Sequence, residues 1–403
     1  MRLLQLCKGD KRKNKLNIIH MKTLRDFDFN GKRALARCDF NVPVENGKVQ
    51  DDFRIKAVLP TIEYLKNAGA KVILMSHLED SEGKNLSLKP VKEKLEEYLN
   101  DKISIADDCV GKEVEENIIK MRNSEILLLE NLRMRKEEKE NSKEFAKQLS
   151  ELGDIYVNDA FSVCHRTHAS VVGVPKILPS CAGLLLEKEI KILSKIMENP
   201  ERPLVAIIGG AKISAKAKVI DKFLKVADHV LLGGKIANAI LQIKGIYKDG
   251  VFDNGGITDE VKNINLTSTK LHLPVDVIVS ADAAGKNPIK ESAVGKLEKG
   301  ELIFDLGPET ITIFSAIIKE AETIIWAGPM GLFEVFAFEN GTKRITKAIA
   351  ENENAFKVIG GGDTISAVSK FNLLDKFDHV STGGSAMLEF LGGEKLPGIE
   401  VLG

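Results

Sequence analysis

The sequence predicts an α/β protein with two doubly wound parallel sheets, one in each of two Rossmann-like domains, joined by a helix. Short apolar segments alternate with amphipathic helical segments along the chain, which is typical of parallel sheets covered by crossover helices. The length of 403 residues suits two such sheets. Residues 184–199 have helical periodicity and end at Pro200, so we expect them to connect the two domains.

The first half of the chain contains predicted strands and helices in alternation. Apolar, β-branched segments predict buried strands at 33–39, 70–76, 126–129 and 155–158. Apolar residues spaced three and four apart predict amphipathic helices at 55–68, 89–100 and 138–152.

The second half contains six apolar segments that each run directly into glycine and are followed by a helical pattern. We expect six strands that end at Gly209-Gly210, Gly233-Gly234, Gly307, Gly328, Gly360-Gly361-Gly362 and Gly383-Gly384. Ligands of open parallel sheets bind beyond the carboxyl ends of the strands, where glycine lets backbone amides approach a phosphate. Repeated glycine turns therefore favour a nucleotide over simple turn formation. Neither GxxxxGK[ST] nor a helix-opening GxGxxG occurs, which argues against a P-loop enzyme and a standard dinucleotide-binding protein.

The composition argues against several protein classes. The 58 basic and 58 acidic side chains balance, so the overall charge attracts neither nucleic acid nor an anionic membrane. No apolar run approaches the roughly 20 residues of a membrane-spanning helix. Five widely spaced cysteines without a CxxC pair argue against a disulfide framework and against a zinc site. They predict that the protein works in the reducing cytoplasm. Residues 1–20 carry six basic side chains and one acidic one, which predicts a disordered extension or an early start before Met21.

Charged residues after the glycine turns are candidate nucleotide ligands. Lys212 and Lys216 stand four residues apart in the first turn of a predicted helix, where positive charge opposes the helix dipole. A bound polyphosphate would offset that cost, although two solvated lysines are the alternative. Asp363 either caps a helix or holds Mg²⁺ with phosphate oxygens. Glu334 either binds ribose hydroxyls or is an ordinary surface glutamate.

Arginines are concentrated in the first half, which holds 10 of the 12, whereas 24 of the 33 glycines lie in the second. Arginine binds carboxylate or phosphate with two parallel hydrogen bonds, so a cluster of arginines predicts a pocket for a small, highly anionic molecule. Asp39 and Asn41 share one face of a strand end and would hold a substrate hydroxyl or orient Arg37. The candidate residues at strand ends and loop starts are Arg37, Arg54, Arg133 and Arg166, with His77, His165 and His168 in similar places.

At this point the chain resembles the phosphoglycerate kinase family. The resemblance covers the sequence from about residue 22 to the C-terminus, with the motifs in the family's order. The motifs are RCDFNVP (37–43), SHL (76–78), ENLR (130–133), NDAF and HRTH (158–168), GGAK (209–212), LPVD (273–276), LGPE (306–309), GPMGLFE (328–334), GGGDT (360–364), STGG (381–384) and LPG (396–398).

The resemblance implies two domains that face a cleft, and a reversible phosphoryl transfer between ATP and the carboxylate of 3-phosphoglycerate. The products are ADP and 1,3-bisphosphoglycerate, Mg²⁺ takes part, and the domains close for direct in-line transfer. One chain contains all the residues implied for binding both substrates and the metal, so a monomer is the simplest expectation. The implied boundaries are 1–20 for the extension, 21–185 for the phosphoglycerate-binding domain, 186–200 for the connecting hinge helix, 201–385 for the nucleotide-binding domain, and 386–403 for a segment that returns to the first domain.

The resemblance also implies a role for each matching residue. Arg37 would lie beside the reacting carboxylate, Lys216 would follow the transferring phosphoryl group, and the amides near Gly362 and Gly384 would complete the catalytic set. Asp363 would hold the metal. The implied phosphoglycerate ligands are Asp39, Asn41, Arg54, His77, Arg133 and Arg166. The implied nucleotide ligands are Lys212, Lys216, Gly307, Glu334, Gly361, Gly362, Asp363 and Thr364.

Several positions depart from the family's usual pattern. Glu79, Asp80 and Ser81 replace glycine, arginine and proline, so an acid stands where an arginine is usual. Further departures are Ser162-Val163-Cys164 for glycine, threonine and alanine, Ala215 for aspartate, Lys235 for glycine, Ala327 for asparagine, and Ser385 for the third glycine of the last turn. From Asp80 we expect a working enzyme with weakened phosphoglycerate affinity. Two alternatives are a catalytically weak relative that binds nucleotide or a partner, and a kinase for a different phosphorylated acid.

Overall fold

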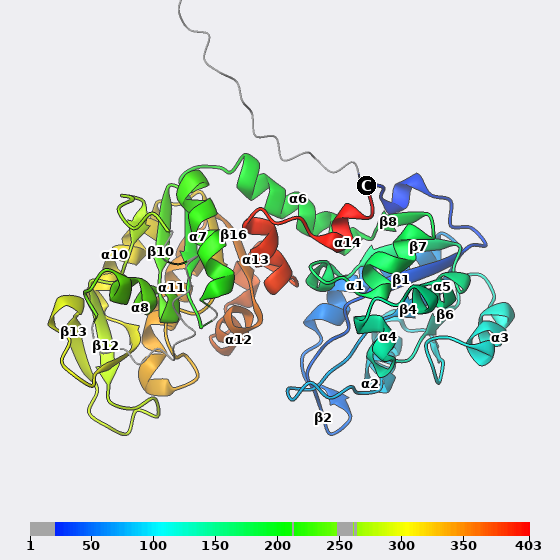
Figure 1. Cartoon of the computed structure of the whole chain (residues 1–403), viewed down its shortest axis with the longest axis horizontal. Coiled ribbons are helices and arrows are strands. Elements are labelled where there is room, and N and C mark those ends of the chain that lie inside the picture. Colours follow the sequence, from blue (N-terminus) through cyan, green and yellow to red (C-terminus); the bar gives the residue numbers. More distant parts are fainter. Residues whose placement is uncertain (1–20, 212, 248–260, 262–263) are drawn as a thin grey trace, which may run out of the picture.

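Two lobes joined by one long helix make up the computed structural model, which describes residues 21–211, 213–247, 261 and 264–403 (Figure 1). The connecting helix is α6 (Leu184–Glu198), within one residue of the predicted connector. The predicted basic extension at 1–20 and the candidate ligand Lys212 lie outside the described residues.

The N-terminal domain contains a six-stranded sheet in which every pair of neighbours is parallel. Across the sheet the order is β5 (Ser104–Ile105), β6 (Ile126–Leu128), β4 (Lys71–Met75), β1 (Arg33–Cys38), β7 (Ile155–Asp159) and β8 (Ser180–Ala182). Its helices are α1 (Phe53–Asn67), α2 (Lys89–Leu99), α3 (Lys112–Lys120), α4 (Lys136–Lys139) and α5 (Lys143–Glu151). A small hairpin of β2 (Val44–Glu45) and β3 (Lys48–Val49) precedes α1.

Apolar side chains cover both faces of this sheet, as the doubly wound fold requires. Successive residues of a strand point to opposite faces. On β1, Ala34 and Ala36 belong to one buried cluster with residues of α1 and α2, and Leu35 belongs to a second cluster with residues of α3 and α5. Near-continuous apolar strands of this kind are typical of buried parallel sheets.

The C-terminal domain contains a second six-stranded parallel sheet. Its order is β11 (Leu271–His272), β10 (His229–Leu232), β9 (Leu204–Ile208), β15 (Thr323–Ala327), β16 (Phe356–Gly360) and β17 (His379–Ser381). The helices of this domain and the C-terminal segment are α7 (Ser214–Val226), α8 (Gly234–Ile243), α10 (Pro308–Lys319), α11 (Asn340–Glu351), α12 (Gly362–Lys370), α13 (Ser385–Leu391) and α14 (Pro397–Glu400).

One predicted strand of the second half lies outside this parallel sheet. The strand before Gly307 is β14 (Leu302–Leu306), which pairs antiparallel with β12 (Asp276–Ser280). With β13 (Lys290–Ala293) these strands form a separate three-stranded sheet. The prediction of a parallel strand here was wrong, because an apolar segment that ends in glycine has the same pattern in either orientation.

The predicted helix at 138–152 is also corrected, since it is two helices, α4 and α5. The helix is interrupted at Asn141, whose φ of +53° lies in the left-handed region. Ser142 then caps α5, and its hydroxyl accepts a hydrogen bond from the amide of Phe145 at 3.4 Å. The break lets the buried Glu138 accept hydrogen bonds from the amide and hydroxyl of Ser170 at 2.9 and 2.6 Å.

The chain crosses between the lobes at α6 and again near the C-terminus. Glu189 of α6 is fully buried and contacts His379 Nε2 at 2.8 Å and the amide of Thr382 at 2.7 Å. After α13 the chain returns to the N-terminal domain, where the Gly398 amide donates to the Cys164 carbonyl at 2.8 Å. The last helix, α14, lies beside that domain in Figure 1. Glu189 therefore ties β17 and the turn after it to α6, and Gly398 ties the C-terminal segment to the N-terminal domain.

A buried carboxyl group at the start of α6 makes stability depend on pH. Asp159 Oδ1 accepts the amides of Leu185 and Leu186 at 2.9 and 3.1 Å, and burial raises the pKa of Asp159 to about 7. The folded state then holds a proton that the unfolded chain releases near pH 4, so this stabilisation is lost as the pH rises through 7. The parent protein should lose unfolding free energy between pH 5 and 8 as Asp159 ionises. In Asp159→Asn this loss should be smaller by about 2–3 kcal/mol. Urea unfolding at both pH values measures it, and an unchanged loss would contradict the assignment.

Candidate active site

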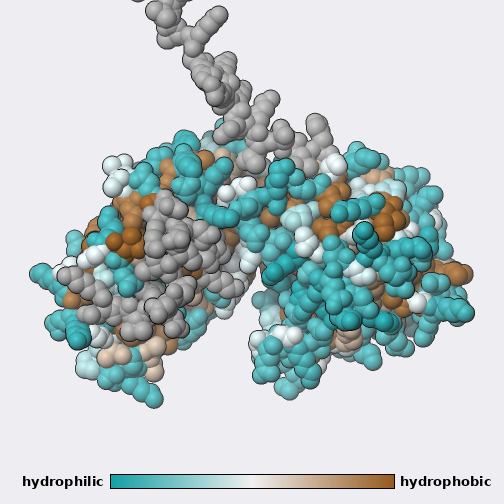
Figure 2. All heavy atoms as spheres, in the orientation of Figure 1, coloured by the Kyte–Doolittle hydropathy of each residue, from teal (hydrophilic) through white to brown (hydrophobic). Residues whose placement is uncertain are grey.

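A cavity lies between the two lobes and takes its walls from both; we call it the interdomain cavity. Figure 2 shows the hollow between the lobes in which it lies. From the N-terminal domain it is lined by Asn41, Arg54, His77, Glu79, Arg133, Ser162, Val163, His165 and Arg166. From the C-terminal half of the chain it is lined by Lys216, Ala327, Gly328, Gly360, Gly361, Gly362, Asp363, Thr364, Gly383, Gly384, Ser385 and Leu388.

Topology brings the N-terminal residues together. Strands β1, β4 and β6 are parallel neighbours, so their carboxyl ends meet at one edge of the sheet. Asn41 follows β1, His77 follows β4 and Arg133 follows β6. Arg166 follows β7, the neighbour of β1 on its other side. Five of the six predicted phosphoglycerate ligands therefore line the interdomain cavity, with Arg54 supplied by the first turn of α1.

The sixth predicted ligand, Asp39, is buried behind Arg54. Only 1% of its side chain is exposed, and its Oδ2 lies 3.3 Å from Arg54 Nη1 and accepts the Ser162 hydroxyl at 2.5 Å. Arg54 Nη1 also donates to the Asn41 carbonyl at 2.9 Å. Ser162, which stands where the family usually has glycine, thus holds the Asp39 carboxylate, and Asp39 orients Arg54.

Arg37 does not line the cavity, although we predicted it beside the reacting carboxylate. It is fully buried, its Nε donates to the Ser170 hydroxyl at 3.0 Å, and its Nη2 lies 3.2 Å from His77 Nδ1. Nη1 donates to the Cys38 carbonyl. The guanidinium of Arg37 is therefore bonded to neighbouring groups of the protein interior.

The histidines of the site are neutral at pH 7. Burial first, and neighbouring arginines second, lower the pKa of His77 well below its ordinary value and that of His168 to about 4. Burial and Arg166 lower the pKa of His165 to about 4. The positive charge of this wall therefore comes from its guanidinium groups.

Glu79, not Asp80, is the acid that reaches the arginines. Glu79 forms an ion pair with Arg133, and its Oε1 lies 2.7 Å from Lys139 Nζ. Asp80 does not line the interdomain cavity but lines an adjoining cavity between the same lobes, which also contacts Arg54 and Glu79. Its Oδ1 accepts the amides of Glu82 and Lys84 at 3.0 and 2.8 Å. From the sequence we assigned no role to Glu79, which stands where the family usually has glycine.

Lys216 and two glycine-rich turns form the opposite wall. Only 6% of Lys216 is exposed, and its ammonium donates to the Gly209 carbonyl. Gly361 and Gly384 have φ of +95° and +50°, in the left-handed region that favours glycine. Ser385 follows as the first residue of α13, a helical position at which a Cβ causes no strain.

Thr364 lines the same wall, but its hydroxyl is used internally. It accepts the amide of Gly328 at 2.7 Å and donates to the Gly360 carbonyl at 3.0 Å. These bonds hold the start of α12 against the end of β15.

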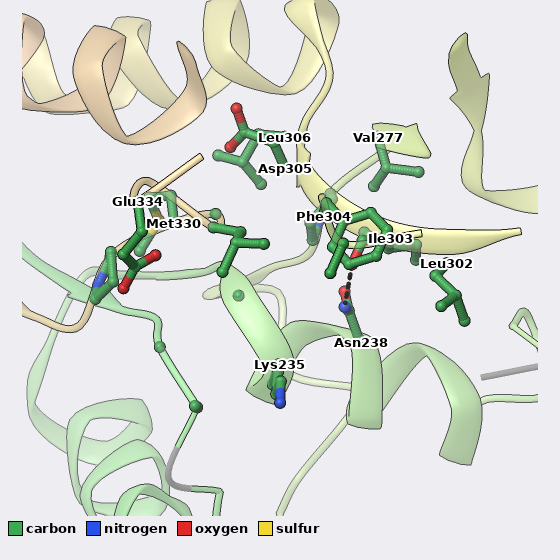
Figure 3. Close-up of a pocket in the computed structure, with 18 of the residues that line it drawn as sticks. Lys235, Asn238, Val277, Leu302, Ile303, Phe304, Asp305, Leu306, Met330 and Glu334 are labelled. Carbon is green, nitrogen blue, oxygen red and sulfur yellow. Dashed lines mark hydrogen bonds between the residues drawn. The ribbon is translucent and has the colours of Figure 1, made fainter. Parts of the chain in front are cut away.

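A second, largely apolar cavity lies in the C-terminal domain beside the first; we call it the apolar cavity. Figure 3 shows Phe304 and Ile303 of β14 together with Met330 and Glu334 from the loop after β15. Asn238 of α8 donates to the Ile303 carbonyl at 3.3 Å (Figure 3). Asp363 lines both cavities, so they adjoin at the start of α12. The apolar lining residues were not predicted, since their pattern does not differ from that of core residues.

Comparison with known proteins agrees with this arrangement. The family model described as phosphoglycerate kinase matches residues 24–394. The chain belongs to the phosphoglycerate kinase family. A protein of Dictyoglomus turgidum named phosphoglycerate kinase is 46% identical over 386 residues, covering 94% of this chain and 97% of its own length. One of Borrelia garinii subsp. bavariensis with the same name is 46% identical over 397 residues, covering 95% and 99%.

Solved structures of the family share the fold. Phosphoglycerate kinase from Coxiella burnetii is 37% identical with a TM-score of 0.81, and that from Pyrococcus horikoshii OT3 is 34% identical with a TM-score of 0.82. Each comparison covers 95% of this chain and 98% of the other. The chain is accordingly a phosphotransferase, and the resemblance seen in the sequence is confirmed.

Gly307 is the one predicted nucleotide ligand among the described residues that lines neither of these two cavities. Its neighbour Leu306 lines the apolar one. The start of α10 is already capped by Asp276, whose carboxylate accepts the amides of Glu309 and Thr310 at 2.9 and 2.7 Å. The amides of Glu309 and Thr310, which follow Gly307, are thus bonded to a carboxylate of the protein.

Asp363 has the properties of a magnesium ligand. Its side chain is exposed in the first turn of α12, and no described residue bonds to its carboxylate. Among the residues that the structure describes, no cluster of three metal-binding side chains occurs. Protein sites commonly bind Mg²⁺ through one or two carboxylates together with substrate phosphates, so a single carboxylate in the lining of the interdomain cavity fits this ion.

No helix in the described part of the chain has the length and apolar character needed to span a bilayer.

Proposed function

We propose that this chain transfers a phosphoryl group reversibly between ATP and the carboxylate of 3-phosphoglycerate, with Mg²⁺, and forms ADP and 1,3-bisphosphoglycerate. One observation carries the proposal. The interdomain cavity has arginines on one wall and Lys216 with glycine turns on the other, and it adjoins an apolar cavity. An anionic acid on the first wall and a nucleotide on the second would meet there.

On the N-terminal side, Asn41, Arg54, His77, Arg133 and Arg166 bind phosphoglycerate. Arg54 takes the place beside the reacting carboxylate, because it is 31% exposed and lines the cavity, whereas Arg37 is fully buried. Arg37 and Asp39 are positioning residues: Arg37 acts through His77, and Asp39 acts through Arg54.

On the C-terminal side, the adenine base occupies the apolar cavity and Glu334 holds the ribose hydroxyls. Lys212, Lys216 and the amides of Gly361 and Gly362 bind the phosphates. Asp363 holds Mg²⁺, which supplies positive charge to the phosphate oxygens. Thr364 supports this wall through its two internal hydrogen bonds.

Phosphoryl transfer depends mainly on in-line positioning and on neutralising charge at the equatorial oxygens. The acceptor carboxylate is already ionised at neutral pH, so no general base is needed. Lys216 and the amides near Gly362 and Gly384 stabilise the charge of the transferring group. The lobes close to bring the substrates into line and to exclude water, in a cytoplasmic monomer.

A coupled assay with MgATP and 3-phosphoglycerate tests the proposal. Turnover by the parent chain supports it, whereas retained ATP binding without turnover favours the nucleotide-binding relative. Turnover with another phosphorylated acid alone favours the kinase of different specificity, which the replacements at Asp80 and at Ser162-Val163-Cys164 suggested. Of these residues, Ser162 and Val163 line the interdomain cavity.

Arg54→Met should lower kcat/KM for 3-phosphoglycerate about 100-fold, because it removes a fixed cation beside the reacting carboxylate. Lys56→Met is the matched control, since Lys56 lies on the same helix, is 55% exposed and pairs with Asp52 at 2.9 Å. Steady-state kinetics of both variants checks this. Equal losses in the two variants would show that Arg54 has no particular role.

A further inference from the structure

Glu79 places a carboxylate on the arginine-rich wall of the interdomain cavity. Its side chain is 16% exposed, lines the interdomain cavity and pairs with Arg133, which is 11% exposed. Through its other oxygen it lies 2.7 Å from Lys139 Nζ on α4. The carboxylate therefore bridges two cations, one within the cavity wall and one, Lys139, that is 52% exposed.

Arg133 keeps hydrogen-bonding capacity that Glu79 does not use. Its Nε is buried and has no hydrogen-bond partner among the described residues. A guanidinium has five N–H donors in a planar fork, and a carboxylate bonded through one nitrogen leaves most of them available. Arg37, Arg54 and Arg133 all act on the same imidazole, His77, so the neighbourhood of Arg133 is strongly positive.

We propose that Glu79 is a built-in competitor that occupies Arg133 until a dianionic phosphoryl group of the substrate displaces it. The inference rests on the proposed role of Arg133 in binding phosphoglycerate. A phosphate beside Arg133 would otherwise face the Glu79 carboxylate at close range, and two like charges repel. Lys139 contacts the other carboxylate oxygen and retains Glu79 when Arg133 releases it.

The exchange selects for doubly charged groups. A phosphate monoester carries about −1.5 to −2 charges and three acceptor oxygens at pH 7, whereas Glu79 carries one charge. A phosphoryl group therefore outcompetes Glu79 at Arg133, but a singly charged carboxylate does not. The enzyme gains discrimination against unphosphorylated acids and loses affinity for its own substrate.

Glu79→Gln tests this directly, with inorganic sulfate as the dianionic probe. We expect the Kd of sulfate, measured by calorimetry, and the KM for 3-phosphoglycerate each to fall about fivefold or more, with kcat changed less than about twofold. Glu82→Gln is the matched control, because Glu82 is an exposed acid three residues along the same loop. Glu79→Ala repeats the test, and thermal unfolding checks that each variant is folded.

The double variant Glu79→Gln/Arg133→Gln locates the effect. In the Arg133→Gln background, the gain in sulfate affinity from Glu79→Gln should disappear. A sulfate Kd that is unchanged or weaker in both Glu79 variants overturns the inference, as does an equal gain in Glu82→Gln. If the parent does not turn over 3-phosphoglycerate but Glu79→Gln still binds sulfate more tightly, the competitor role stands and the proposed reaction fails.

Discussion

Replacing Lys216 with methionine should lower kcat by about 100- to 1,000-fold, with little change in the KM for 3-phosphoglycerate. Lys216 is almost fully buried in the wall of the interdomain cavity, and its ammonium is held by the Gly209 carbonyl. A fixed cation in a water-poor cleft stabilises the charge of the transferring phosphoryl group far more than a solvated one would.

The matched control for this loss is Lys218→Met. Lys218 lies on the same helix but is 57% exposed and pairs with Glu394 at 2.8 Å, outside the cavity lining. Steady-state kinetics of both variants, with thermal unfolding to show that each is folded, measures the effect. If Lys216→Met retains more than a tenth of the parent kcat, the proposed role of Lys216 is wrong.

Replacing Arg37 with methionine should destabilise the protein by about 3–5 kcal/mol. Its guanidinium is fully buried and donates to the Ser170 hydroxyl and the Cys38 carbonyl. The same Ser170 hydroxyl donates to the buried Glu138 at 2.6 Å. Methionine would leave these polar groups without their cation in a low-dielectric interior.

Arg33→Met is the control for Arg37→Met, since Arg33 begins the same strand but is 36% exposed and pairs with Asp154 at 2.7 Å. An exposed pair of this kind should cost under about 1 kcal/mol. Urea unfolding of both variants gives the difference. Normal stability with lost activity in Arg37→Met would instead restore the catalytic role that we first predicted for Arg37.

The predicted architecture was correct where local pattern decides it. The connector α6 and strands β1, β4, β6 and β7 lie within one or two residues of their predicted bounds, and β9, β10, β15, β16 and β17 end at or just before the predicted glycine turns. The short strands β5, β8 and β11 were not predicted. The pattern failed at β14, where strand orientation depends on a partner distant in sequence, and at Asn141, where one residue with positive φ divides a helix.

The candidate site was only partly predictable. Motif positions identified Arg54, Arg133, Lys216 and Asp363, all of which line the interdomain cavity. Local pattern did not show that Asp276 caps α10 and leaves Gly307 outside both cavities. It also did not show which of two neighbouring acids, Glu79 or Asp80, would turn toward Arg133, since a loop's side-chain directions depend on the surfaces around it.

By itself, the sequence determined the alternation of strands and helices, the glycine-rich turns at strand ends, and the division of arginines and glycines between the two halves. These features depend on residues near one another in the chain. Tertiary structure alone decided that Arg37 is buried while Arg54 is accessible, and that Glu79 occupies Arg133. Burial and ion pairing depend on which strand ends and helices meet in space, and residues far apart in sequence supply those partners.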